Sequence, residues 1–336
     1  MDDRIIFDET LLIHVNRIVG DVSFGVNVGE CLGLLGPNGA GKTTSISMIS
    51  GTLNHTHGTI IYGNKNFSKT NSQDFSLGYC PQINSLWTLL TVKETIQFYL
   101  NICGYPPNDI PYYTQSLIEA FGIENHSNKL IKNISGGTKR KLSLIVAICS
   151  SPSYLILDEP SAGMDPFTRR YMWKIILNLK KVRKTATLLT THSTEEAEAL
   201  CDRIAIMIKG RLVCVDTSRS IKMNYNTYYT LEVFTSEPNK FEEEYVKQKN
   251  IFGIESKSNQ ESSSSSTPPS ETSEPNKNYE VENSINYQKY SVKMKTEGIA
   301  KVFSLMEEAK ENGLVSQYNF GQYSLEQVFI SFINNI

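Results

Sequence analysis

The sequence predicts an α/β fold, in which helices cover both faces of a mostly parallel sheet, followed by a smaller α+β domain. Three observations support this prediction. Short apolar runs of strand length alternate with helical patterns up to about residue 222. A glycine-rich segment at 36–44 joins one apolar run to a helical stretch. Beyond residue 222, strand and helix patterns resume around a stretch rich in Ser, Pro and Asn.

Composition bounds the class of protein. The chain has 336 residues, of which 40% are hydrophobic and 20% are charged, as in globular proteins with one large or two ordinary domains. Its net charge of −2 gives no electrostatic reason to expect nucleic acid as a partner. The six cysteines contain no C-x-x-C pair and several lie in apolar runs, so reduced core cysteines are expected.

No part of the sequence has the pattern of a membrane span or a signal peptide. No apolar run approaches 18 residues, and the amino-terminal stretch lacks the apolar core of a secretory signal. If the protein serves a membrane process, we expect another chain to supply the membrane-spanning part.

The segment 36–44 fills the phosphate-binding pattern G-x-x-x-x-G-K-[ST] with Gly36, Gly41, Lys42 and Thr43. An apolar run at 31–35 precedes it and a helical pattern at 42–50 follows it. Such an arrangement directs backbone N–H groups and a helix N-terminus at an anion. We therefore expect Lys42 to reach the β- and γ-phosphates of a nucleotide and Thr43 to ligate Mg²⁺. A chance glycine-rich turn is the alternative, and both flanks disfavour it.

Further apolar runs supply the other strands of the predicted sheet. They lie at 58–62, 76–80, 154–158, 186–191, 203–208 and 211–215, with Lys209 and Gly210 forming a hairpin signal between the last two. A mostly helical insert at about 84–150 separates the second of these runs from the third. After residue 222, strands are expected at 227–235, 287–295 and 315–320, and helices at 299–311 and 325–333.

Two acidic residues end one of the apolar strands. Asp158 and Glu159 follow the run at 154–157, at the carboxyl end where open α/β sheets bind ligands. Asp158 is expected to hold Mg²⁺, and Glu159 to polarise an attacking water as a general base. A solvated pair of acids on a loop is the alternative, and the apolar strand before them and Pro160 after them disfavour it.

A second anion site is predicted at Ser135, Gly136 and Gly137, at the head of a helix. One nucleotide does not need two such sites on one subunit. Two subunits that face each other head to tail do need them, because each could then cap the γ-phosphate held by the other.

With these segments in place, the chain resembles the nucleotide-binding domain of ATP-binding cassette (ABC) transporters, and among them the A subfamily of lipid exporters. The motifs occur in the family's order. They are Gly36, Pro37, Asn38, Gly39, Ala40, Gly41, Lys42, Thr43 and Thr44 for Walker A, Gln82 for the Q-loop, Ser135, Gly136 and Gly137 for the signature, Asp158 and Glu159 for Walker B and the catalytic glutamate, Asp165 for the D-loop, and His192 for the switch histidine.

The resemblance implies a P-loop NTPase fold of the ABC ATPase type with a helical subdomain, and a composite catalytic site. Two cassettes would enclose two ATP·Mg²⁺ between them. Walker A, the signature and Asp165 would bind nucleotide, while Thr43, Gln82 and Asp158 would hold the metal. Lys42, Gln82, Glu159 and His192 would carry the catalytic roles, with Glu159 activating water and His192 contacting the γ-phosphate.

Other segments support the subfamily or depart from the family pattern. The signature continues as Thr-Lys-Arg-Lys at 138–141, and the segment 323–329 resembles the end of the A subfamily's C-terminal regulatory domain. The basic residues at 139–141 form either a solvated helix face or a partner contact. The zone where an aromatic normally stacks on adenine has no tyrosine, so His14 or Phe7 could substitute. Proteins of the A subfamily normally carry membrane helices in the same polypeptide, whereas this chain is expected to have none.

We therefore predict an ABC ATPase domain at 1–222, with its helical subdomain at about 84–150, and a regulatory-like α+β domain at 223–336. A disordered insert is expected at about 255–286, since its composition offers few apolar groups. The predicted function is the ATP-hydrolysing subunit of a lipid or amphiphile transporter, peripheral at the cytoplasmic face of a membrane. Its expected partners are a second cassette and a transmembrane subunit. One alternative is a soluble mechanical or regulatory ATPase. Another is an adaptor that binds nucleotide without turnover.

Overall fold

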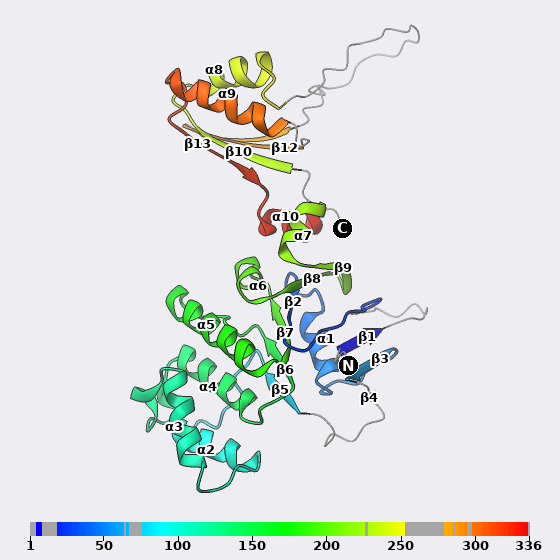
Figure 1. The fold of residues 1–336 in the computed structure, drawn as a ribbon, viewed down its shortest axis with the longest axis vertical. Helices are drawn as coiled ribbons and strands as arrows, with labels where there is room; N and C mark the ends of the chain where they lie inside the picture. The colour runs from blue at the N-terminus through cyan, green and yellow to red at the C-terminus, as the bar shows by residue number, and fades with distance from the viewer. Residues whose placement is uncertain are drawn as a thin grey trace. The chain divides into compact units, whose positions relative to one another are not determined.

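The computed structural model describes residues 5–8, 19–63, 65–66, 76–225, 228–252, 279–284, 286–293 and 298–334 (Figure 1). The chain divides into two compact units, one made of residues 1–218 with 332–336 and the other of residues 219–331. The boundary between the two units, after residue 218, and the domain boundary predicted at residue 222 both lie within helix α7 (Ser218–Tyr225).

The first unit is built around a six-stranded sheet. Its strands lie in the order β5 (Leu77–Cys80), β6 (Tyr154–Asp158), β7 (Ala186–Thr191), β2 (Cys31–Leu35), β8 (Arg203–Ile208) and β9 (Arg211–Asp216). All neighbours are parallel except β8 and β9, which form an antiparallel hairpin. The prediction of a mostly parallel sheet is therefore confirmed. The hairpin turns at Lys209 and Gly210, which have φ angles of 48° and 79°.

Alternate residues of the central strands belong to two separate apolar cores. In β6, Leu155 and Leu157 pack in one core while Tyr154 and Ile156 pack in the other. Because side chains alternate between the faces of a strand, each core covers one face of the sheet. The first core also holds buried side chains of α2 (Val92–Ile102), α3 (Ile110–Ala120), α4 (Gly136–Ile148) and α5 (Pro166–Arg183). The second holds those of α1 (Lys42–Ile49).

Smaller elements complete this unit. An antiparallel sheet joins β1 (Ile5–Asp8), β3 (Thr59–Tyr62) and β4 (Lys65–Asn66), and β3 contributes to the same core as α1. Short 3-10 turns, η3 (Glu124–His126) and η4 (Ile131–Asn133), lead from α3 to α4, and α6 (Thr194–Leu200) follows β7. Within the described part of the chain, no helix is both long and apolar enough to cross a bilayer.

The second unit packs helices on an antiparallel sheet. Its strands lie in the order β11 (Tyr279–Ser284), β12 (Tyr287–Lys293), β10 (Tyr228–Phe234) and β13 (Gln317–Gln322). The helical segments are α8 (Pro238–Phe241), the π-helical η5 (Glu242–Gln248), α9 (Ile299–Glu311) and α10 (Leu325–Asn334). Buried side chains of β10, β12, η5 and α9 form its core.

The predicted disordered insert at 255–286 is wrong at its carboxyl end, where residues 279–284 form β11. This strand pairs along its length with β12, placing Val281 opposite the buried Tyr290. The strand has only a short alternation of apolar residues, which follows directly on a long polar stretch, and its composition alone therefore does not distinguish it from that stretch. Residues 255–278 and 285 of the predicted insert lie outside the described residues.

Candidate active site

The phosphate-binding loop connects β2 to α1, as the sequence predicts. A Cβ on Gly36 would lie 2.4 Å from the carbonyl oxygen of Met207, so only glycine fits there. Gly39 and Gly41 have φ angles of 80° and 99°, which strain any other residue. The loop is held at both ends: the Gly36 N–H donates to the Thr191 carbonyl at 3.3 Å, and the Ala40 carbonyl accepts from Gly210 at 3.0 Å.

Lys42, the first residue of α1, is buried beneath this loop. Its Nζ donates to the carbonyls of Gly36 at 2.8 Å and Pro37 at 3.1 Å, and lies 4.0 Å from Glu159 Oε1. Burial lowers the pKa of Lys42, and the negative charges of Glu159 and Asp158 act in the opposite direction. An anion at the loop would favour the charged ammonium further. Pro37, Asn38 and Gly39 are at least partly open to solvent above it.

Asp158 and Glu159 stand where β6 ends. The Thr190 hydroxyl donates to Asp158 Oδ1 at 2.5 Å, and burial, as the largest cause, raises the pKa of Asp158. Glu159 has a φ of 46°, a left-handed conformation that costs a non-glycine residue about 1–2 kcal/mol. Its N–H donates to both the carbonyl and the hydroxyl of Thr190, each at 3.1 Å. The neighbouring strand β7 therefore holds this strained residue in place.

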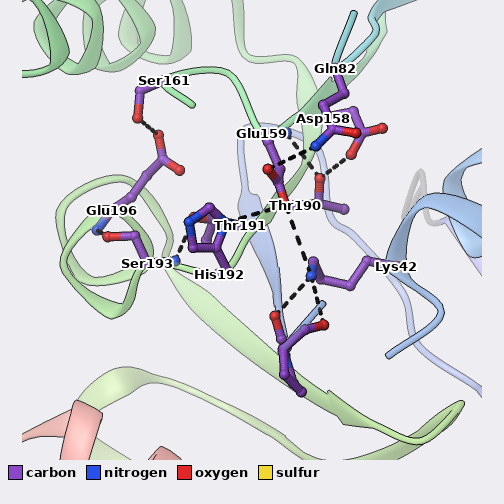
Figure 2. A network of polar contacts seen from close by, with 12 residues as sticks. Lys42, Gln82, Asp158, Glu159, Ser161, Thr190, Thr191, His192, Ser193 and Glu196 are labelled. Carbon is purple, nitrogen blue, oxygen red and sulfur yellow. Dashed lines mark hydrogen bonds and ion pairs between the residues drawn. The ribbon is translucent and has the colours of Figure 1, made fainter. Parts of the chain in front are cut away.

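The Glu159 carboxylate is the centre of a polar network (Figure 2). Gln82 Nε2 donates to its Oε2 at 3.1 Å, and His192 Nδ1 lies 3.3 Å from its Oε1. Gln82, Asp158 and His192 lie at or just after the carboxyl ends of the parallel strands β5, β6 and β7, and Lys42 begins α1, which follows β2 through the phosphate-binding loop. Five of the predicted site residues thus meet at the carboxyl edge of the sheet, where open α/β sheets bind ligands.

The predicted metal ligands are all oxygen donors. Thr43 is exposed beside Lys42, the amide oxygen of Gln82 remains available while its nitrogen contacts Glu159, and Asp158 has a second carboxylate oxygen. Such donors suit Mg²⁺, which usually takes one or two carboxylates together with phosphates of the substrate. Among the described residues, no group of three or more His, Cys, Asp or Glu could hold a metal ion. The oxygen donors of Thr43, Gln82 and Asp158 fit a Mg²⁺ whose remaining ligands are nucleotide phosphates. Thr44, the next residue along α1, is half-buried.

The predicted second anion site lies at the start of another helix. Ser135 caps α4 by accepting a hydrogen bond from the Thr138 N–H at 3.2 Å, and Asp165 caps α5 through the N–H groups of Phe167 and Thr168. A Cβ on Gly137 would lie 3.2 Å from Thr168, so the two helix starts are neighbours. Ser135, Gly136 and Asp165 are exposed, and their hydrogen bonds are local. The structure does not join them to the network around Glu159.

Sequence reasoning missed two buried parts of the site. Arg140, predicted as a solvated residue or a partner contact, is only 4% exposed and donates to backbone carbonyls beside Gln82 and Glu159. Glu196 of α6 accepts from the Ser161 hydroxyl at 2.5 Å and from Trp173 Nε1 at 3.1 Å. No local pattern distinguishes Arg140 from the lysines on either side of it, because its partners come from distant segments.

Comparison with known proteins agrees with this geometry. Residues 19–162 match the family model described as "ABC transporter". A solved structure described as the ATP binding subunit of an ABC transporter covers 66% of this chain, with a TM-score of 0.59, 25% identity and 93% of its own length aligned. The cbiO1 structure from Clostridium perfringens also covers 66% of this chain, with a TM-score of 0.59 and 23% identity over 91% of its own length, and supports the fold. The chain therefore contains an ATP-binding domain of the ABC transporter family.

The curated relatives narrow this class to the A subfamily. The chain is 36% identical over 92% of its length to human "Cholesterol transporter ABCA5", and 34% identical over 99% to "Phospholipid-transporting ATPase ABCA3" of Rattus norvegicus. It is 36% identical over 94% of its length to human "ATP-binding cassette sub-family A member 13". These matches cover 18%, 18% and 6% of the relatives, so the chain spans less than a fifth of their length. It is homologous to the ATP-binding region of A-subfamily transporters.

Proposed function

We propose that this chain hydrolyses ATP with Mg²⁺ and that hydrolysis drives transport of a lipid or another amphiphile across a membrane. One observation supports the chemical part above all others. The carboxylate of Glu159 contacts both Gln82 and His192 and lies 4.0 Å from Lys42 Nζ, beside the phosphate-binding loop. An adaptor that only binds nucleotide would not need this arrangement.

In the proposed mechanism each residue acts by position or charge. The loop amides and Lys42 bind the phosphates and offset their charge. Glu159 accepts the proton of the attacking water, and Gln82 and His192 hold its two carboxylate oxygens in a fixed direction. Bound Mg²⁺ would offset the charge of the β- and γ-phosphates, and Thr43, Gln82 and Asp158 would hold it.

ABC cassettes work as dimers with transmembrane subunits, and we propose that a second cassette completes this site. The exposed helix starts at Ser135 and Asp165 would cover the nucleotide of the partner, with Gly136 and Gly137 allowing close approach of the phosphate. The hydrogen bonds of Ser135 and Asp165 are local and do not join the network around Glu159, which supports this arrangement.

The transport part of the proposal rests on the relatives, whose names include cholesterol and phospholipid transporters. Large apolar side chains just after Gln82 also support a membrane partner, since Ile83 is 79% exposed, Trp87 53% and Leu89 76%. We place the domain at the cytoplasmic face of a membrane. That a separate chain supplies the transmembrane part stays a prediction from the sequence. A soluble ABC ATPase with no transport role is the second candidate.

Two experiments test the proposal. Glu159→Gln is expected to abolish ATP turnover and to leave an ATP-stabilised dimer, whereas Glu195→Gln, at an exposed position of α6, is expected to keep the wild-type rate. Equal rates in Glu159→Gln and wild type would remove Glu159 from the mechanism. Membrane fractionation and co-purification decide the transport part. A protein that stays wholly soluble and recovers no membrane subunit would favour the second candidate.

A further inference from the structure

Arg140 has an unusual environment for a residue in a run of three basic side chains. Its guanidinium is buried and uses all three nitrogens. Nε donates to the carbonyl of Pro160 at 2.9 Å, while Nη2 donates to the carbonyls of Asp158 at 2.5 Å and Glu159 at 3.0 Å. Nη1 donates to the carbonyls of Pro81 and Gln82, the latter at 3.2 Å, and lies 3.4 Å from Asn84 Oδ1. The planar five-donor fork of arginine suits such converging acceptors.

The accepting carbonyls belong to the two segments that carry the proposed catalytic groups. One segment follows β5 and contains Gln82, and the other ends β6 and contains Asp158 and Glu159. Each has a proline beside its functional residue, Pro81 or Pro160, so each lacks a backbone donor there. Glu159 is also in the left-handed conformation. Strand β7 holds the Glu159 segment from one side through Thr190, whereas the guanidinium of Arg140 bonds to both segments at once.

We propose that Arg140 is a positioning residue that fixes Gln82 and Glu159 relative to each other through their backbones. Arg140 lies on α4, the helix that begins at the signature residues 136–137. Its hydrogen bonds therefore also connect the helix that carries the half-site offered to a partner cassette with the chain's own half-site. This inference rests on the proposed function of the site.

The test compares Arg140→Gln and Arg140→Lys with a matched control, Lys141→Gln. Lys141 is on the same helix and also caps a backbone carbonyl, that of Phe121 at 3.0 Å, while lying 4.1 Å from the centre of the Tyr171 ring. Its contacts are away from Gln82 and Glu159. A loss of general helix packing would affect all three variants alike, whereas a loss of positioning would affect only the Arg140 variants.

Arg140→Gln is expected to lower kcat by about 10- to 100-fold and to raise the Mg²⁺ concentration needed for half-maximal rate by about 10-fold. Affinity for a fluorescent ATP analogue without Mg²⁺ should stay near the wild-type value, because the phosphate-binding loop is untouched. In the nucleotide-free protein, amide hydrogen exchange should become faster in peptides covering 81–84 and 158–162. Arg140→Lys should lie between wild type and Arg140→Gln, because an ammonium cannot reach all the acceptors. The control should match wild type in every readout.

The inference is overturned if Arg140→Gln keeps the wild-type kcat, Mg²⁺ dependence and hydrogen exchange. It is also overturned if Lys141→Gln loses as much activity as Arg140→Gln. If Arg140→Gln does not fold, Arg140→Lys decides by the same measurements. If wild type itself does not hydrolyse ATP, the proposed function fails, and the exchange measurement alone decides the role of Arg140. Faster exchange confined to the two segments supports positioning, and unchanged exchange refutes it.

Discussion

Replacing Glu196 by alanine is expected to destabilise the ATP-binding domain strongly. The Glu196 side chain is 2% exposed, and its Oε1 accepts hydrogen bonds from Ser161 at 2.5 Å and Trp173 at 3.1 Å. Hydrogen bonds to a charged group contribute about 1.5–3 kcal/mol each, so two lost bonds cost about 3–6 kcal/mol. Removing a buried carboxylate returns part of this energy. A net loss of about 2–4 kcal/mol in the free energy of unfolding is therefore expected.

Urea unfolding followed by tryptophan fluorescence measures this loss, since Trp173 reports on the network directly. Glu195→Ala is the matched control, because Glu195 lies in the first turn of the same helix α6 but is exposed. It should cost only about 0.3–1 kcal/mol, the usual contribution of an acid at a helix start. Because α6 begins two residues after His192, the Glu196 variant should also hydrolyse ATP more slowly. A difference between the two variants of less than about 0.5 kcal/mol would refute the reasoning.

Two further changes probe the phosphate loop and the end of β6. Gly36→Ala places a Cβ 2.4 Å from the Met207 carbonyl oxygen and should cost about 1–3 kcal/mol and lower nucleotide affinity. Gly321→Ala, with no atom within 4 Å of its Cβ and no assigned role in binding, is the control in thermal denaturation and in binding of a fluorescent ATP analogue. Unchanged affinity in Gly36→Ala would contradict this geometry. Burial raises the pKa of Asp158, so its contribution to stability is present below the unfolded pKa and lost as pH rises through the folded pKa. Asp158→Asn should therefore raise the Tm of the nucleotide-free protein at pH 7, with a smaller gain near pH 4, and should abolish hydrolysis. A lower Tm at pH 7 would count against this electrostatic account.

The sheet and the phosphate loop could be predicted because their signals are local. Strands β2, β6 and β7 read as continuous apolar runs, since both of their faces are buried in the two cores. The glycine-rich pattern at 36–43 predicts a strand before the loop and a helix after it, all within one short stretch of sequence. The carboxyl-edge rule for parallel strands then brings Asp158 and His192 toward Lys42, although they are distant in sequence.

Residues whose partners come from elsewhere in the chain could not be predicted in this way. Arg140 follows a helix pattern that is equally consistent with solvent, and only the folded chain brings Gln82 and Glu159 to its guanidinium. Thr190 reads as an ordinary strand residue, yet it holds Asp158 and the backbone of Glu159. For the predicted adenine contacts, His14 lies outside the described residues, and Phe7 is described only as part of β1.

The central claim is that each catalytic site is shared between two cassettes. Two variants test it when mixed, one with a defective phosphate loop, Lys42→Ala, and one with a defective signature, Gly136→Asp. Gly136 is exposed with open space around it, so the added carboxylate repels a partner's phosphate without disturbing its own chain. Each variant alone should be inactive.

An equimolar mixture forms mixed dimers that contain one intact site, made of the good phosphate loop of one chain and the good signature of the other. Random pairing makes half of the dimers mixed, and each mixed dimer has one intact site out of two. The hydrolysis rate of the mixture should therefore recover to about a quarter of the wild-type rate. The measurement is ATP hydrolysis by the mixture against each variant alone. Recovery to this level is the expected result. A mixture no faster than its components, or full activity of Gly136→Asp alone, contradicts the shared site.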